Sequence, residues 1–181
     1  TTRDVREFGP IRWGLDVARF GEDRTALARR YGNHMPYPVM SWRGLDTMQV
    51  AGKVKAEYDN ALKKPEAICV DVIGLGAGVV DRMRELGLPV IGVNVAESPS
   101  AHDRYNRLRD ELWFNAREWF ERRDVRMVKD EDLIAELTMP NYRLLSSGKI
   151  QVESKDEIKK RAGGNTSPDL ADAFCLTFAR G

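Results

Sequence analysis

The spacing of apolar residues changes near residue 45, and this change constrains the fold more than any other feature of the chain. Before it, three short extended runs are separated by turn-forming residues: 11–18, 25–31 and 37–42. In the first run Trp13 and Leu15 fall on one face, and Gly14 and Asp16 fall on the other. Such closely connected runs are typical of antiparallel strands, so this part predicts a meander.

After this point helical spacing alternates with short apolar runs. The first helix is expected at 46–62, with Asp46 as N-cap and an apolar stripe that ends at Leu62. The remaining elements follow in order: a buried strand at 67–72, a glycine loop at 74–78, a helix at 79–86 and a buried strand at 89–95. Strands that are apolar throughout are expected to be covered on both faces, as in α/β proteins.

The C-terminal half predicts further helices and a hairpin: helices at 104–122 and 131–137, strands at 142–145 and 149–152, a basic helix ending at 161 and a final helix at 167–180. Ser154 with Glu157 forms a capping box before the basic helix, and Ser167 followed by Pro168 starts the last one. We therefore expect one α/β domain over 1–181, with a mixed β-sheet flanked by helices and an extra β-hairpin near the C-terminus. The polar residues 1–10 are expected to be a linker remnant.

Composition excludes several classes of protein. No apolar stretch approaches the roughly 20 residues of a membrane helix, and the first residues are too polar for a signal peptide, so a cytoplasmic protein is expected. Cys69 and Cys175 lie in apolar runs and are expected to be reduced core thiols; with only two histidines, a zinc site is excluded. The net charge of +1 means that nucleic acid would have to bind through a local basic patch.

Four aspartates occupy positions that a hydrophobic core disfavours. Asp16 lies within a strand, Asp71 ends a buried one, and Asp169 and Asp172 flank the apolar stripe of the last helix. Crowded carboxylates repel one another unless a cation lies between them, and Mg²⁺ and Mn²⁺ prefer oxygen ligands. Two such ions support hydrolysis of a phosphodiester, which fits a site without an evident histidine, cysteine or serine nucleophile.

Each acid also has a structural interpretation. Asp169 is placed to interact with a helix dipole, Asp16 to pair with Arg19 or Arg24, and Asp71 to cap the glycine loop. Only the combination of several acids, each at the edge of an apolar element, favours a metal site.

Three parts of the chain resemble the motifs of the nuclease domain of tailed-phage large terminases. They are GLDVARFGEDRTA at 14–26, VDVIGLGAG at 70–78, and KDEIKKR at 155–161 followed by SPDLADA at 167–173. The resemblance implies a ribonuclease-H-like fold and a two-metal endonuclease that cuts concatemeric viral DNA during packaging in the infected host. It implies double-stranded DNA, a portal protein, a small terminase subunit and an ATPase domain as partners. No G-x-x-x-x-G-K-[ST] motif is present, so the chain is expected to lack the ATPase part.

The resemblance also assigns residues. It implies that Asp16, Asp71 and Asp172 are the catalytic metal ligands and ranks Asp169 below Asp172. For Asp23 it implies a supporting role, and the alternative is a loop acid that caps a turn.

The cations before the last motif are a candidate for phosphate contact: Lys155, Lys159, Lys160 and Arg161. Acids interleave with the arginines of the helix at 104–122, which favours a solvated face there.

Three other functions stay open. The glycine loop is compatible with nucleotide binding, although G-x-G-x-G is a weak signal whose alternative is a tight turn. A second alternative is a resolvase- or transposase-like nuclease, and a third is a non-catalytic module that docks on a portal or on DNA.

Overall fold

The computed structural model describes residues 6–19, 23–164 and 166–180. Its strands are β1 (Ile11–Asp16), β2 (Thr25–Tyr31), β3 (His34–Met35), β4 (Met40–Trp42), β5 (Ala67–Asp71), β6 (Val90–Val93), β7 (Arg126–Met127), β8 (Tyr142–Leu144) and β9 (Ile150–Val152). Its helices are α1 (Thr47–Asn60), α2 (Gly76–Glu85), α3 (Leu108–Glu121), α4 (Glu131–Leu137), α5 (Lys155–Ala162) and α6 (Asp169–Leu176). The first five residues of the predicted lead-in at 1–10, and residues 20–22 of the predicted loop, lie outside the described residues.

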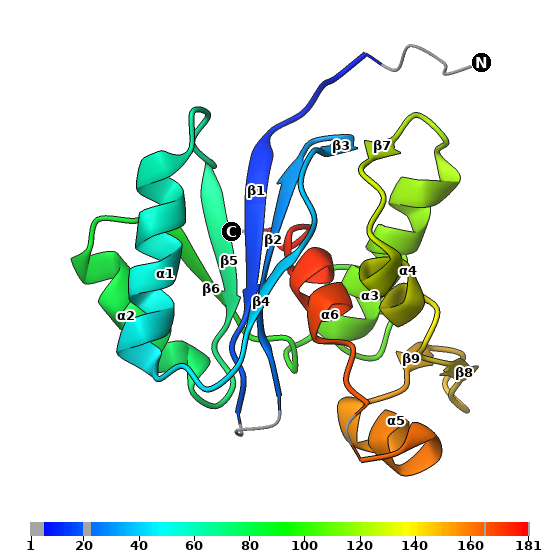
Figure 1. Cartoon of the computed structure of the whole chain (residues 1–181). Coiled ribbons are helices and arrows are strands. Elements are labelled where there is room, and N and C mark those ends of the chain that lie inside the picture. Colours follow the sequence, from blue (N-terminus) through cyan, green and yellow to red (C-terminus); the bar gives the residue numbers. More distant parts are fainter. Residues whose placement is uncertain (1–5, 20–22, 165, 181) are drawn as a thin grey trace.

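A mixed sheet of seven strands forms the centre of the molecule, in the order β6-β5-β1-β2-β3-β7 with β4 paired to β2. Strand β1 is antiparallel to β2 and parallel to β5, which is in turn parallel to β6. Helices α1 and α2 cover one face of the sheet, and α3, α4 and α6 cover the other (Figure 1). The predicted α/β class, the mixed sheet and the flanking helices are therefore confirmed.

The two faces of the sheet are made by alternate residues of the same strands. Trp13 and Leu15 of β1, with Ile68 and Val70 of β5, pack in the core under α1 and α2. Their neighbours therefore face α6, because successive side chains of a strand point to opposite sides. This alternation places Asp16 and Asp71, the last residues of β1 and β5, on the same face of the sheet.

Helix α6 lies unusually close to the sheet. A Cβ atom added to Gly14 would come within 1.9 Å of the carbonyl oxygen of Ala173. The residues of β2 beneath the helix are also small, Ala26 and Ala28, and both are fully buried. Small residues in the two central strands thus allow the backbone of α6 to approach the sheet directly.

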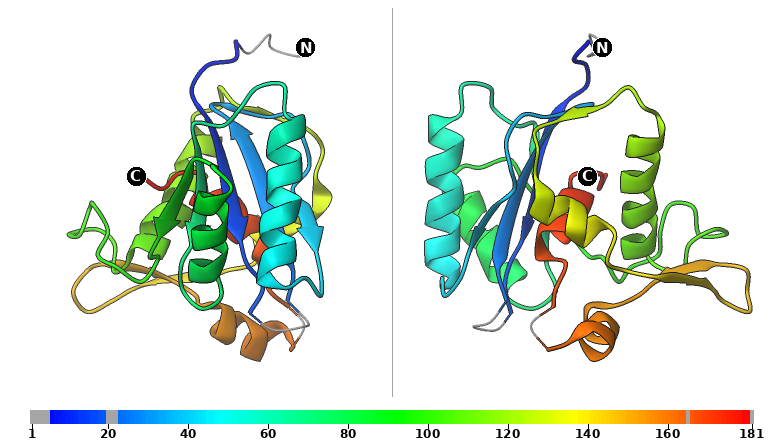
Figure 2. Two further views of the ribbon diagram at one scale, coloured as in Figure 1. Left: turned by 90° about the vertical axis from the view of Figure 1, so that its left-hand side faces the viewer. Right: turned by 45° about the vertical axis from the view of Figure 1, so that its right-hand side comes forward.

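The hairpin predicted near the C-terminus is present and stands apart from the main sheet. Strands β8 and β9 form a separate two-stranded sheet that projects from the body of the molecule (Figure 2). Ile150 is held by backbone hydrogen bonds to Arg104 and Asn106, in the segment before α3.

Several predicted boundaries are wrong. The helix predicted at 104–122 begins only at Leu108, because the backbone near Tyr105 forms a β-bridge with Ile150 instead. The strand predicted at 37–42 is β4 alone, and the two-residue strands β3 and β7 pair with each other, which no pattern in the sequence indicated. Leu62 is fully exposed and takes no part in the apolar stripe of α1.

The ends of two other helices also differ from the prediction. Helix α2 begins at Gly76, inside the predicted glycine loop. Helix α6 stops at Leu176 rather than Arg180, and the guanidinium groups of Arg12 and Arg30 bind the carbonyl of Thr177 that follows it. Ser167 does not cap α6 through its side chain; its hydroxyl donates to Asp169.

Both cysteines are free and buried, as predicted. In the described parts of the chain, no helix combines the length and the apolar character that crossing a membrane requires.

The close contact between β1 and α6 predicts opposite effects for two glycine-to-alanine changes. Gly14→Ala should destabilise the protein by about 2 kcal/mol or more, because the new methyl group overlaps the backbone of α6. Gly78→Ala, inside α2 with open space around it, should be neutral or stabilising by up to about 1 kcal/mol. Urea unfolding of both variants measures the difference. Equal stability of the two would contradict the direct packing of α6 on β1.

Candidate functional site

Two of the predicted acids lie at the ends of neighbouring parallel strands. Asp16 ends β1 with 6% of its surface exposed, and Asp71 ends β5 and is half-buried. The Oδ1 atom of Asp71 accepts a hydrogen bond from the amide of Ile73 at 3.0 Å. Asp71 thus caps the turn into the glycine loop, as its structural interpretation predicted, while its side chain also lines a cavity with Asp16.

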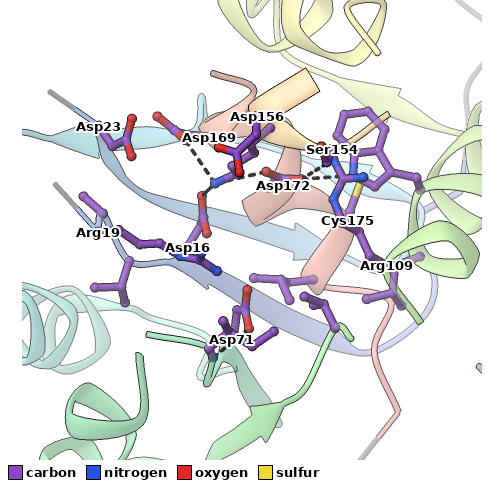
Figure 3. Close-up of a pocket in the computed structure, with 18 of the residues that line it drawn as sticks. Asp16, Arg19, Asp23, Asp71, Arg109, Ser154, Asp156, Asp169, Asp172 and Cys175 are labelled. Atoms are coloured by element: carbon purple, nitrogen blue, oxygen red, sulfur yellow. Dashed lines mark hydrogen bonds and ion pairs between the residues drawn. The ribbon is translucent and has the colours of Figure 1, made fainter. Parts of the chain in front are cut away.

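Helix α6 brings the other two acids to the same cavity. Asp169 and Asp172 are both buried, and every residue of α6 from Asp169 to Leu176 is buried with them. The cavity has a volume of about 330 Å³ and is lined by all four carboxylates (Figure 3). The structure therefore brings together Asp16, Asp71, Asp169 and Asp172, which lie up to 156 positions apart in the sequence.

The ammonium group of Lys155 lies where three of these carboxylates converge. Its Nζ atom is 2.8 Å from Oδ2 of Asp16, 3.2 Å from Oδ1 of Asp169 and 3.2 Å from Oδ2 of Asp172. Lys155 is the first residue of α5, whose N-cap is Ser154. The sequence placed Lys155 in a DNA-binding cluster, whereas its side chain reaches into the acids.

Burial and the charge of Lys155 dominate the electrostatics of the site, and repulsion between the acids adds to them. Burial raises the pKa of Asp16 to about 7; Lys155 partly offsets this shift, and Asp172 and Asp169 add to it. Burial by itself would lower the pKa of Lys155, but the three carboxylates raise it well above its ordinary value. Burial also raises the pKa of Asp71. One ammonium group therefore does not compensate all the negative charge that the fold gathers here.

The two acids of α6 differ in how fully their oxygens are occupied. Oδ1 of Asp169 accepts hydrogen bonds from Ser167 and Lys155, and Oδ2 accepts one from the amide of Arg24 at 3.1 Å. Burial alone would raise the pKa of Asp169, but these partners outweigh it and lower the pKa.

Asp172 keeps one oxygen without a hydrogen bond. Its Oδ1 accepts from Nε1 of Trp113 at 3.0 Å, whereas its buried Oδ2 has only the ion-pair contact with Lys155. Nη2 of Arg109 lies 3.7 Å from the same carboxylate. This contrast favours Asp172 over Asp169 as the acid that can take a further ligand.

The donor set fits a divalent cation in chemistry. It consists of carboxylate oxygens, which Mg²⁺ and Mn²⁺ prefer, and these oxygens already surround one positive charge, that of Lys155. Among the described residues no three acidic, histidine or cysteine side chains are close enough to hold a metal by themselves. Contacts of 2.8–3.2 Å suit an ammonium group, and ligation of Mg²⁺ at about 2.1 Å would require the carboxylates to move inward.

The other predicted basic residues are partly neutralised by acids. Lys159 pairs with Asp23 at 2.9 Å, and both line the cavity. Arg161 pairs with Glu153 at 2.7 Å, and Lys160 is exposed. The predicted cluster is therefore divided: Lys155 reaches the acids, Lys159 lines the cavity, and Lys160 and Arg161 are exposed.

Three residues of this site were missed by the sequence analysis: Arg109, Trp113 and Glu136. Arg109 was interpreted as part of a solvated helix face, yet it lines the cavity, and Trp113 was not assigned to the apolar stripe of α3. Arg24, which the sequence offered as a partner of Asp16, instead forms an ion pair with Glu136 at 2.9 Å beside Asp169. No local pattern distinguishes the three missed residues from ordinary helix residues, because their partners come from distant parts of the chain.

The glycine loop is explained by close packing. A Cβ atom on Gly76 would lie 1.7 Å from the carbonyl oxygen of Asp71, and Gly74 has a positive φ of 73°. The tight-turn interpretation of this loop is therefore sufficient for both glycines.

Neither protein-family models nor curated protein sequences match the chain. The structure, however, is similar to the nuclease domain of the large terminase subunit gp2 of bacterial virus Sf6, with a TM-score of 0.82 and 20% identity over 97% of this chain and 90% of that one. A mutant of the same domain with manganese and β-thujaplicinol gives a TM-score of 0.83 at 19% identity, over 97% and 90% of the two chains. The large terminase nuclease from thermophilic phage G20c with bound magnesium gives 0.68 at 15% identity, over 96% and 84%. The chain thus has the fold of these nuclease domains, and the predicted ribonuclease-H-like fold is confirmed.

The raised pKa of Asp16 predicts how stability depends on pH when no divalent cation is added. Between its ordinary value near 3.8 and about 7, the folded protein retains a proton at Asp16 that the unfolded chain releases. The free energy of unfolding should therefore decrease as pH rises through this window. Glu136, whose pKa burial raises to about 7, contributes in the same direction.

Thermal unfolding in EDTA at several pH values between about 5 and 8 measures this slope. Asp16→Asn should flatten it, because the amide does not titrate. A wild-type slope that Asn at position 16 leaves unchanged would show that Asp16 titrates normally.

Proposed function

We propose that this chain is the metal-dependent endonuclease domain of a phage large terminase, and that it cuts concatemeric double-stranded DNA during genome packaging. The observation that carries the proposal is the convergence of Asp16, Asp71 and Asp172 on one cavity, within a fold that matches terminase nuclease domains. The site combines buried acids with the basic residues of α5, of which Lys159 lines the same cavity, and binding of a polyanion requires such cations.

The proposed cofactor is Mg²⁺ or Mn²⁺, with two ions held by Asp16, Asp71 and Asp172, and with Asp169 as a less available ligand. The presence of manganese and magnesium in similar domains supports this choice. When bound, such ions activate a water molecule and stabilise the leaving oxygen of the cleaved phosphodiester.

Neighbouring elements of the chain would keep the carboxylates of this site in position. Asp16 and Asp71 are fixed by their strands, and Trp113 orients the carboxylate of Asp172 by donating to Oδ1. Lys155 keeps three carboxylates turned toward one point despite their repulsion. The acids are thereby gathered around one point before a divalent cation enters, and binding would then require them to move inward from the distances that suit an ammonium group.

Duplex DNA would contact the basic residues of α5: Lys159, which lines the cavity, and the exposed Lys160 and Arg161. Asp23, paired with Lys159, has a supporting role in this proposal because it orients that side chain. The portal protein, the small terminase subunit and an ATPase domain are the further proposed partners, in the cytoplasm of the infected host.

Cleavage of supercoiled plasmid tests the proposed activity. The purified protein should nick and linearise plasmid in Mn²⁺ and Mg²⁺ but not in EDTA. Asp16→Ala and Asp172→Ala should each reduce the rate by about 100-fold or more, since each removes a proposed ligand. Asp132→Asn, an exposed acid of α4, is the matched control and should leave the rate unchanged.

Two results would contradict the nuclease. Absence of cleavage in every metal at high protein concentration would favour the docking module, and cleavage that persists in both aspartate variants would indicate a contaminating enzyme.

A second experiment tests the DNA contacts. The triple variant Lys159→Ala, Lys160→Ala, Arg161→Ala should bind duplex DNA more weakly, and the dependence of its affinity on salt should flatten by up to about 0.9 per lost phosphate contact. Lys53→Ala, exposed on α1 on the opposite side of the sheet, serves as the control. Equal affinity and equal salt dependence of the triple variant would remove these residues from the interface.

A further inference from the structure

Helix α6, which carries two of the acids, lacks a cap of its own. Its N-cap residue is Pro168, which has no side-chain hydrogen-bonding group. The amide of Leu170, in the first turn, donates instead to Oε1 of Glu136 at 2.8 Å. Glu136 belongs to α4, so a side chain from another helix satisfies one of the free amides that begin every helix.

The second oxygen of Glu136 connects α6 with the loop after β1. Oε2 accepts from Nη2 of Arg24 at 2.9 Å, and the backbone amide of Arg24 donates to Oδ2 of Asp169 at 3.1 Å. Glu136 therefore joins three segments that meet at the cavity: helix α4, the start of α6 and the residue that follows Asp23.

Burying the carboxylate of Glu136 is costly in free energy, and the need to fill space in the core does not explain why an acid is used here. Glu136 is only 5% exposed, and a buried carboxylate is unfavourable unless it is fully paired. Both of its oxygens are paired, and both partners contact the acid-bearing part of the site. One partner is the first turn of α6, and the other is Arg24, whose backbone amide binds Asp169. An apolar residue would fill the same space without fixing either partner.

The consequence for the site is a division of roles between the two acids. Asp169 is held at both oxygens by Ser167, Lys155 and Arg24. Asp172, one turn further along the helix that Glu136 caps, retains a buried oxygen without a hydrogen bond. The position of that oxygen relative to Asp16 and Asp71 depends on where α6 begins.

We propose that Glu136 is a positioning residue of the metal site: it caps α6 from outside and, through Arg24, holds Asp169 so that Asp172 is presented to the cation. This inference rests on the proposed function, because it assigns Glu136 a role in the same site. Glu136 itself does not touch the cation or the DNA.

Glu136→Gln is the informative variant because it preserves shape. Its amide oxygen can still accept from Leu170, but its NH₂ group faces the guanidinium of Arg24. The hydrogen bond that holds the Arg24 side chain is therefore lost, and Glu136 no longer anchors the residue whose backbone amide binds Asp169. Mn²⁺ binding is measured by calorimetry, and the plasmid-cleavage rate is measured over a range of Mn²⁺ concentrations. We expect the dissociation constant and the half-saturating concentration to rise about tenfold or more, with a smaller change in the rate at saturation.

The controls separate positioning from general stability. Asp132→Asn, on the same helix but exposed, should bind and cleave as the wild type does. Adding Arg24→Met to Glu136→Gln removes the clash of donors and should restore thermal stability but not the Mn²⁺ affinity, because the link between Glu136 and Arg24 is still missing; a role in stability alone predicts that the affinity recovers together with the stability.

The two proposals fail in different ways. A wild type that binds Mn²⁺ and cleaves DNA, together with Glu136→Gln and Glu136→Ala variants of unchanged Mn²⁺ affinity, overturns the positioning role and leaves the nuclease intact. A wild type that neither binds Mn²⁺ nor cleaves overturns the proposed function itself.

Discussion

The contact between α6 and β1 determines where the acids of this protein lie. Helix α6 rests on the backbone of β1 at Gly14, and the neighbouring positions of β2 are alanines. At this separation the first turn of the helix reaches the end of the strand, where Asp16 is located. A larger side chain at Gly14 would push the helix outward, and the carboxylates of Asp169 and Asp172 would move away from Asp16.

Such close packing brings several buried carboxylates together, and the rest of the site has to compensate their charge. Burial raises the pKa of Asp16, and the two acids of α6 raise it further. Lys155 compensates part of this charge, and its own protonated state is stabilised by the same carboxylates. The acids and the lysine are therefore mutually dependent, and one ammonium group leaves part of the negative charge uncompensated. In the proposed nuclease, the same excess charge would be satisfied by divalent ions.

The supporting residues show how many separate elements this arrangement uses. Trp113 and Arg109 approach Asp172 from α3, Glu136 approaches the start of α6 from α4, and Arg24 comes from the edge of β2. Helices α3 and α4 thus cover the sheet and also hold the acid-bearing helix in register with the strand ends. The hairpin β8–β9 leads directly into α5 and so into Lys155.

The sequence by itself determined the class of fold and the identity of the four acids, because both follow from local patterns. Alternation along β1 placed Asp16 opposite the apolar face, and helical spacing placed Asp169 and Asp172 one turn apart. Boundaries were predicted less well where tertiary contacts override local preference, as at Tyr105, whose backbone pairs with Ile150 instead of joining α3. Only the tertiary structure decided which side chains surround the acids. Lys155 resembled a surface cation, Arg109 a solvated helix residue and Glu136 an ordinary helix acid. Their actual environments depend on contacts between residues far apart in the chain, and local sequence patterns contain no record of such contacts.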